Sequence, residues 1–136
     1  VQMALDKQVL EFSNSSVKDT LRANLHLASV IGISRVSEEL DIVEASAVLQ
    51  KKGQEYKDKL SAFDQTHSVS ASKILVTAGT PSKELCSLAK KQNIDLVLMG
   101  NVGRKGFKGF VMGNTAEKTL KSLSSDLLVV NSNFQK

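Results

Sequence analysis

A chain of 136 residues can bury the core of one domain, and its apolar fraction of 41% and charged fraction of 24% are ordinary for a soluble globular protein. No apolar run approaches the roughly 18 residues that a spanning helix needs, so no membrane partner is expected. The formal charge of +4 comes from scattered lysines with only 4% aromatics, which does not favour nucleic-acid binding.

Cysteine usage indicates a compartment. Cys86 is the only cysteine, which excludes an internal disulfide and the usual clustered zinc site. Its place beside the apolar positions of a helix predicts a small buried hydrophobe rather than a nucleophile. A reducing cytoplasm fits these facts best.

The N-terminal half predicts helix, strand and helix in that order. Apolar residues recur at helical spacing from Gln2 to about Arg22. Leu25–Ile31 is a predicted strand, followed by Ser34–Glu44, which has no clean period and is taken as a connection. From Ala45 to about Gln65 one apolar face opposes lysines and acids, which predicts a second helix.

The next segment predicts a strand and a well-delimited helix. Lys73–Ala78 is β-branched and ends at Gly79. Thr80 can cap the following helix, and Pro81 occupies its first turn, where a missing N–H costs nothing. Asn93 is placed to end that helix.

The C-terminal part predicts two more strands around a last helix. Ile94–Gly100 is nearly continuous in apolar residues, as in a parallel strand covered on both faces. Gly113 leads into a helix with Ala116, Leu120 and Leu123 inward, and Asp126–Val130 is the final strand. This alternation predicts an α/β fold with a doubly wound parallel sheet, whose ligands bind beyond the carboxyl ends of the strands.

The segment Met99–Glu117, MGNVGRKGFKGFVMGNTAE, is the candidate binding loop. It contains five of the chain's eight glycines and runs into the start of a helix. Glycines let backbone N–H groups converge on a phosphate, and a helix N-terminus favours an anion. Two alternatives need no ligand: the glycines serve turns alone, and Asn114 with Glu117 forms a capping box.

The glycine spacing also carries a family resemblance. Gly100-x2-Gly103-x9-Gly113 resembles the signature of the universal stress protein family, in which the last glycine is followed by Ser or Thr. DLVLMG, GNTAEKTL, SDLLVV and TAGTPSKELCSLAKKQNIDLVLMG are also similar to that family. GNTAE and VLEFSNS are most similar to the second domain of the E-type tandem proteins.

The resemblance implies a Rossmann-like, five-stranded sheet of the adenine-nucleotide alpha-hydrolase type. Residues 1–136 would be a single universal stress protein domain, or the C-terminal half of a tandem protein. Asp6 is one candidate for the acid that closes the family's first strand. The preferred interpretation is that Val1–Leu5 is already helical and that the first strand lies upstream of Val1. That strand is central in the family's sheet, so a chain lacking it should fold poorly.

The resemblance also implies a ligand and its contacts. ATP, with Mg²⁺ carried by the nucleotide, would lie between the strand ends and the glycine loop. Val30 would line the adenine pocket, and Met99 and Gly100 would pass beside the ribose and phosphates. The phosphate cradle would be formed by Gly103, Gly113, Asn114 and Thr115.

Two functions remain as hypotheses. The first is a universal stress response protein that binds ATP and acts by binding and assembly with a second such domain, through the last-strand edge at Leu127–Val130. The alternative is an interaction module with a vestigial or differently occupied pocket, which Asn114 favours because it replaces Ser or Thr. Catalysis is not expected, since the sequence offers no dedicated general base, although weak ATPase activity stays open.

Overall fold

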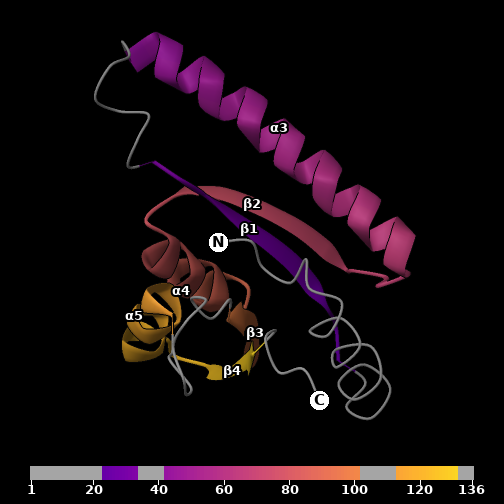
Figure 1. Ribbon diagram of the computed structural model, residues 1–136, viewed down its shortest axis with the longest axis vertical. Helices are drawn as coiled ribbons and strands as arrows, with labels where there is room; N and C mark the ends of the chain where they lie inside the picture. Colours follow the sequence, from indigo (N-terminus) through magenta and orange to yellow (C-terminus); the bar gives the residue numbers. More distant parts are fainter. Residues whose placement is uncertain (1–22, 34–41, 102–112, 132–136) are drawn as a thin grey trace.

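The computed structural model describes residues 23–33, 42–101 and 113–131 (Figure 1). In chain order the elements are β1 (His26–Gly32), α3 (Ile42–His67), β2 (Lys73–Gly79), α4 (Pro81–Lys91), β3 (Leu96–Asn101), α5 (Asn114–Ser122) and β4 (Asp126–Asn131). The element ends differ from expectation by no more than three residues, the largest difference being Ala45 expected and Ile42 observed at the start of α3. The expected helix at Gln2–Arg22, with Asp6 in it, and the glycine loop at 102–112 lie outside the described residues.

The described strands form two parallel pairs. β1 pairs with β2, and β3 pairs with β4. Val30 of β1 lies beside Thr77 of β2, and Met99 of β3 lies beside Val129 of β4. The α/β class and the parallel pairing are confirmed. Within the described ranges the sheet supplies four of the five expected strands, and the expected first strand falls outside them.

Helices cover the strands on two sides. In Figure 1, α3 lies on one side of β1 and β2, and α4 and α5 lie on the other. Side chains of a strand alternate between its faces. Leu25 and Leu27 accordingly pack with Phe63 of α3, whereas Val30 packs with Leu85 of α4.

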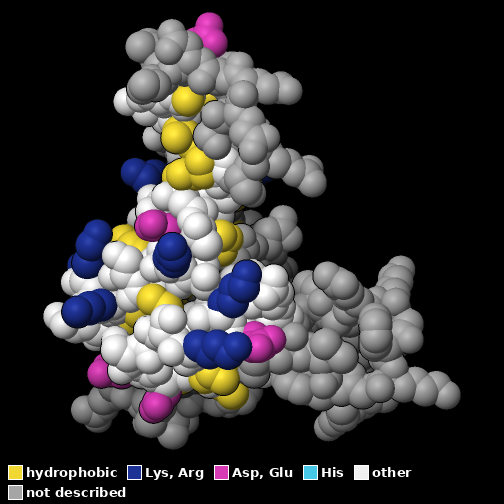
Figure 2. Space-filling view, turned by 90° about the vertical axis from the view of Figure 1, so that its left-hand side faces the viewer, with side chains coloured by type: hydrophobic (Ala, Val, Ile, Leu, Met, Phe, Trp, Pro, Cys, Tyr) yellow, Lys and Arg dark blue, Asp and Glu magenta, His cyan; other side chains and the backbone are white. Residues whose placement is uncertain are grey.

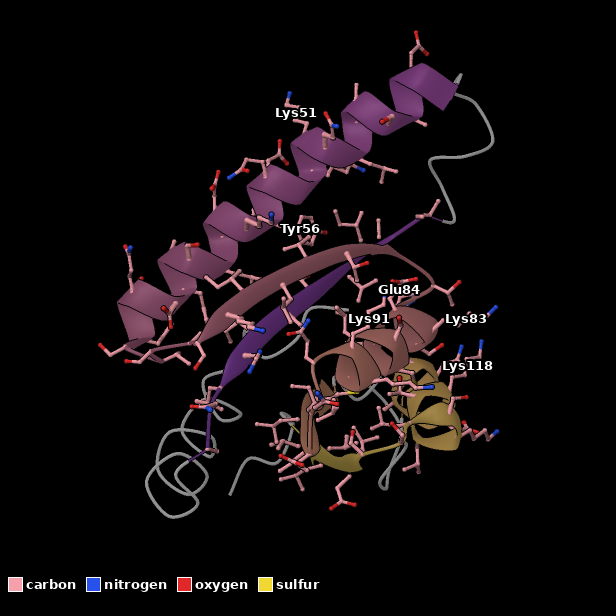
Figure 3. The ribbon with its side chains drawn as sticks, turned by 180° about the vertical axis from the view of Figure 1, so that it is seen from behind. Lys51, Tyr56, Lys83, Glu84, Lys91 and Lys118 are labelled. Atoms are coloured by element: carbon pink, nitrogen blue, oxygen red, sulfur yellow. The ribbon has the colours of Figure 1, made fainter. Side chains whose placement is uncertain are left out.

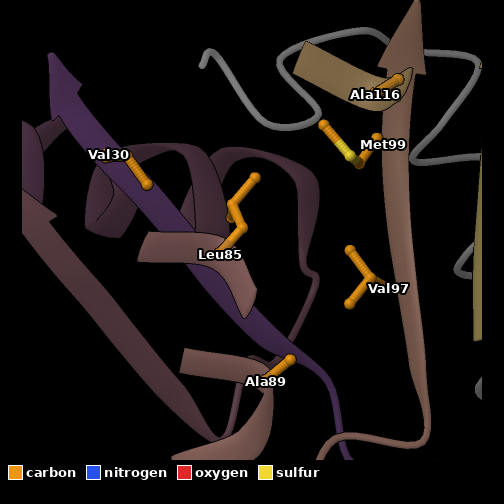
Figure 4. Packing of buried hydrophobic residues seen from close by; sticks show 6 residues of the cluster. All are labelled: Val30, Leu85, Ala89, Val97, Met99 and Ala116. Atoms are coloured by element: carbon orange, nitrogen blue, oxygen red, sulfur yellow. The ribbon is translucent and has the colours of Figure 1, made fainter. Parts of the chain in front are cut away.

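The main hydrophobic core joins the two strand pairs through α4 (Figure 4). Val30 of β1 and Met99 of β3 are each only 2% exposed, and both belong to one cluster with Leu85 of α4. The other buried members are Ala89, Val97 and Ala116. Burying a side chain the size of Leu or Met contributes about 1.5–3 kcal/mol, so this cluster is the largest identifiable source of stability.

The helices before β2 and β3, α3 and α4, end in the same way. In α4, Asn93 takes φ = 51°, and the N–H groups of Asn93 and Ile94 donate to the carbonyls of Lys90 and Ala89 at 3.3 and 2.9 Å. This pattern is a Schellman motif, in which a left-handed residue satisfies the last carbonyls of a helix. The expectation that Asn93 ends this helix is confirmed. Thr80 occupies the N-cap position, but its side chain makes no cap hydrogen bond.

The α3 terminus repeats the motif without a glycine or asparagine. Ser68 has φ = 51°, and Val69 N–H donates to Asp64 carbonyl at 3.1 Å. Val69 is buried against Phe63, and Asp64 Oδ1 accepts a hydrogen bond from Ala71 N–H at 2.9 Å. The turn therefore delivers the chain directly into β2.

The inward face of α5 differs from expectation at Leu120. Its side chain is 52% exposed, whereas Thr119 is fully buried. Thr119 Oγ1 donates to Thr115 carbonyl at 2.7 Å, and Cys86 Sγ of α4 lies 3.7 Å from Thr119 carbonyl. Close packing of α5 against α4 turns the buried stripe toward Thr119, which leaves Leu120 at the flank. The prediction that Leu120 points inward is therefore wrong.

Substituting alanine for each of two glycines, Gly79 and Gly53, tests the backbone geometry and the space around them. Gly79 has φ = +153°, and a Cβ there would lie 2.7 Å from Glu84 Oε1. We expect Gly79→Ala to lower the free energy of unfolding by about 1–3 kcal/mol because of strain. Gly53→Ala, inside α3 with nothing within 4 Å of its Cβ, should raise it by about 0.5–1 kcal/mol. Urea unfolding measures both, and effects of the same sign would contradict the geometry.

Candidate functional site

The carboxyl ends of the strands form the candidate edge. β1 and β2 end at Gly32 and Gly79, which are direct neighbours in the register. β3 ends at Asn101, immediately before the glycine loop. Because α4 and α5 each follow the carboxyl end of a strand, their N-termini are directed to this same edge, where open α/β sheets bind ligands.

The start of α5 has the backbone geometry of an anion site. Gly113 is the N-cap, with φ = −62° and ψ = 150°, and its carbonyl accepts a hydrogen bond from Glu117 N–H at 2.9 Å. As a glycine, this cap residue contributes no side-chain hydrogen bond to the helix. The N–H groups of a first turn have no acceptor within the helix, and the positive end of the helix dipole lies there as well. Of the predicted phosphate cradle, Gly113, Asn114 and Thr115 thus lie at a helix N-terminus.

The predicted capping box is absent. Asn114 is the first residue of α5 rather than its cap, because Gly113 already supplies the extended conformation that the cap position needs. Glu117 Oε1 instead pairs with Lys121 Nζ at 3.0 Å. The prediction of a cap by Asn114 and Glu117 is wrong. The exposed side-chain amide of Asn114 therefore makes no cap hydrogen bond to the first turn of α5.

The strand residues of the predicted site lie deeper. The side chains of Val30 and Met99 belong to the core against α4 and are almost fully buried. Each residue as a whole, backbone included, is only 2% exposed, so neither presents a surface to a ligand in this structure. Gly100 follows Met99 on β3 and lies beside Val130 of β4 in the register. Gly103 lies in the stretch 102–112, outside the described residues.

A carboxylate at the same edge escaped the sequence reasoning. Thr77 Oγ1 donates to Glu84 Oε2 at 2.9 Å, and Glu84 Oε1 faces the backbone of Gly79 (Figure 3). Thr77 is the register neighbour of Val30, so Glu84 covers the end of the β1–β2 pair. The sequence signal that could have identified Glu84 is its position four residues after Thr80, in the first turn of α4. A half-buried carboxylate held in this way can accept a hydrogen bond from a hydroxyl or amino group.

The remaining titratable groups offer little chemistry. Burial raises the pKa of the Cys86 thiol, which keeps it protonated near neutral pH and unreactive as a nucleophile. Within residues 23–33, 42–101 and 113–131, no three His, Cys, Asp or Glu side chains are grouped to hold a metal ion. Of the helices in this part of the chain, none is long and apolar enough to cross a bilayer.

Comparisons with known proteins agree on one family. The model of the universal stress protein family matches residues 5–131. The universal stress protein E homolog of Haemophilus influenzae is 26% identical over 129 residues, which are 93% of this chain and 42% of that protein. Universal stress protein MJ0531 of Methanocaldococcus jannaschii is 29% identical over 85 residues, 62% of this chain and 49% of that protein. The chain thus spans less than half the length of these curated relatives.

The solved structure of protein MJ0577, from the same archaeon, shares the fold. Its TM-score is 0.71 at 22% identity, and the match covers 95% of this chain and 91% of that one. At this identity the likeness establishes the architecture alone.

The exposed position of Asn114 predicts that it is dispensable for folding. We expect Asn114→Ala to change the free energy of unfolding by less than about 0.5 kcal/mol, because the side chain makes no cap bond. Thermal and urea unfolding measure this. A loss of about 1 kcal/mol, typical of removing an N-cap side chain, would contradict the assignment of Gly113 as the cap.

Proposed function

Because this chain belongs to the universal stress protein family, we propose that it binds an adenine nucleotide at the carboxyl edge of its strands. ATP is the proposed ligand, with Mg²⁺ carried by the nucleotide. The phosphates would lie against Gly113, Asn114 and Thr115. The protein would act by binding and assembly rather than by turnover.

The observation that carries the proposal is that the N-cap of α5 is a glycine. A glycine at this position has no side chain of its own to fill the cap position, which leaves room for phosphate oxygens to approach the first-turn N–H groups. Asn114 stands beside this point with a free amide that can donate to a phosphate oxygen, in place of the hydroxyl that Ser or Thr would offer.

The remainder of the nucleotide would extend along the strand ends toward β1 and β2. Gly32 is exposed, with nothing within 4 Å of a Cβ built on it, so a flat group can pass over the end of β1. The Glu84 carboxylate stands at the neighbouring strand end and can accept a hydrogen bond from a sugar hydroxyl or base amine.

Solved neighbours support the ligand class. One universal stress protein was solved in complex with cAMP, with a TM-score of 0.53 and 20% identity to this chain. A family protein of Arabidopsis thaliana was solved with AMP bound, with a TM-score of 0.55 and 14% identity. These proteins have the fold in common with this chain, and their ligands make adenine nucleotides the first class to test.

Assembly would use the outer edge of β4. In the described part of the chain β4 pairs with β3 alone, and its apolar residues Leu127–Val130 are half-buried. An apolar strand edge left open invites pairing with another strand. A second domain of this family, in a dimer or in a tandem chain, is the proposed partner at that edge.

Asn114 also favours a second candidate function. An interaction module that has lost nucleotide binding would tolerate an amide where the family signature has a hydroxyl. In that case the α5 N-terminus would hold another anion or none. The two candidates differ in whether the purified chain binds nucleotide.

Calorimetric titration with ATP and magnesium tests the proposal. We expect saturable heat, and at a hundredfold excess over the dissociation constant about 2.7 kcal/mol of added stability, seen as a thermal shift of several degrees. Gly113→Val should abolish both, because its side chain would occupy the phosphate position, while Gly53→Ala in α3 should keep both. Circular dichroism confirms that each variant is folded.

A titration without any binding signal would contradict the proposal. If the folded wild-type chain gives no heat and no thermal shift with ATP up to millimolar concentration, the interaction module becomes the better account.

A further inference from the structure

The lysines of α4 and α5, separated in the sequence, gather on one face of the molecule. All five are exposed: Lys83, Lys90 and Lys91 of α4, and Lys118 and Lys121 of α5. The two helices lie side by side, and Figure 2 looks onto this face, where Lys and Arg side chains outnumber acids over the middle of the surface. The sequence alone showed scattered lysines, and the packing of the two helices brings them together.

The acids of these two helices do little to neutralise the face. Glu84 is directed to Thr77 at the end of β2, and Glu117 pairs with Lys121 at the exposed surface. For the other four lysines, no carboxylate of the described residues lies within ion-pair distance. Their charge is therefore available to an external partner.

The lysines are arranged over a broad surface rather than around a pocket. Lys83 and Lys90 are seven residues apart on α4, about 10 Å along the helix axis. Lys83 of α4 and Lys118 of α5 are on the same side of the molecule in Figure 3, and the two helices are in contact. A broad anionic surface can approach several of these ammonium groups at once, whereas one extended acidic chain would follow only one row of them.

The chemistry of the face discriminates among anionic partners. Neither α4 nor α5 contains an arginine or an aromatic residue. Sequence readout of duplex DNA commonly uses arginine forks, and binding of single strands uses stacked rings. Lysine, a flexible point charge, suits the mobile headgroups of anionic lipids, to which each residue near the surface contributes separately.

We propose that the lysine face of α4 and α5 docks the protein on an anionic bilayer surface. Contact of this kind needs no spanning helix and is reversible. It differs from the partner edge at β4 and from the nucleotide edge, so it does not depend on the proposed function. It departs from the expectation of no membrane partner, which was drawn from the lack of an apolar run long enough to span a bilayer.

Vesicle co-sedimentation of the full chain tests the proposal. We expect binding to phosphatidylcholine vesicles that contain phosphatidylserine, little binding to phosphatidylcholine alone, and release by high salt because of screening. Each lysine removed should lower the partition coefficient about fivefold, so the double variant Lys83→Gln/Lys118→Gln should lose about 25-fold. The matched control is Lys51→Gln/Lys57→Gln, two exposed lysines of α3, and it should bind like the wild type.

Three outcomes would overturn the proposal. One is equal binding to charged and neutral vesicles, and another is an equal loss in the α3 control. The third is binding to duplex DNA or to polyglutamate with none to the charged vesicles, which would assign the face to a different class of partner. Since all four substitutions are at exposed positions, circular dichroism should show the same fold in each variant.

Discussion

The packing of α4 across both strand pairs is the contact on which the rest of the described structure depends. Val30 of β1 and Met99 of β3 belong to strands that do not pair with each other among the described residues, yet both are buried against Leu85. Without this helix the two pairs would share no core, and a two-stranded parallel pair is not stable by itself in water. Pro81 in its first turn and the left-handed Asn93 after its last turn mark where α4 begins and ends.

The candidate functional features, the N-terminus of α5 and the carboxylate of Glu84, are both positioned by α4. Because α5 packs against α4 through Thr119, its N-terminus is held at the carboxyl edge of the strands, where Gly113 leaves the first turn open. The same helix places Glu84 over the end of β2. The outer surfaces of α4 and α5 then form one lysine-bearing face. One packing arrangement thus positions both the strand edge proposed to bind nucleotide and the lysine-bearing face proposed to dock on a bilayer.

The sequence predicted what local chemistry determines and missed what tertiary packing determines. Pro81 and Asn93 act through their own backbone preferences, so the limits of α4 could be predicted. The exposure of Leu120 depends on how α5 rotates against α4, and the cap of α5 depends on Gly113 adopting an extended conformation before Asn114. Neither is encoded in helical periodicity. The glycine loop was recognisable by spacing, but that the side chain of Met99 turns into the core required the fold.

The central claim is that the start of α5 holds the phosphates of a nucleotide. Amide NMR of the labelled chain during titration with ATP tests it most directly, because each backbone N–H reports separately. The account predicts that the signals of Gly113, Asn114 and Thr115 shift most and saturate together, while the middle of α3 stays unchanged. Saturable shifts that avoid the start of α5 would contradict it, because the nucleotide would then bind elsewhere on the protein.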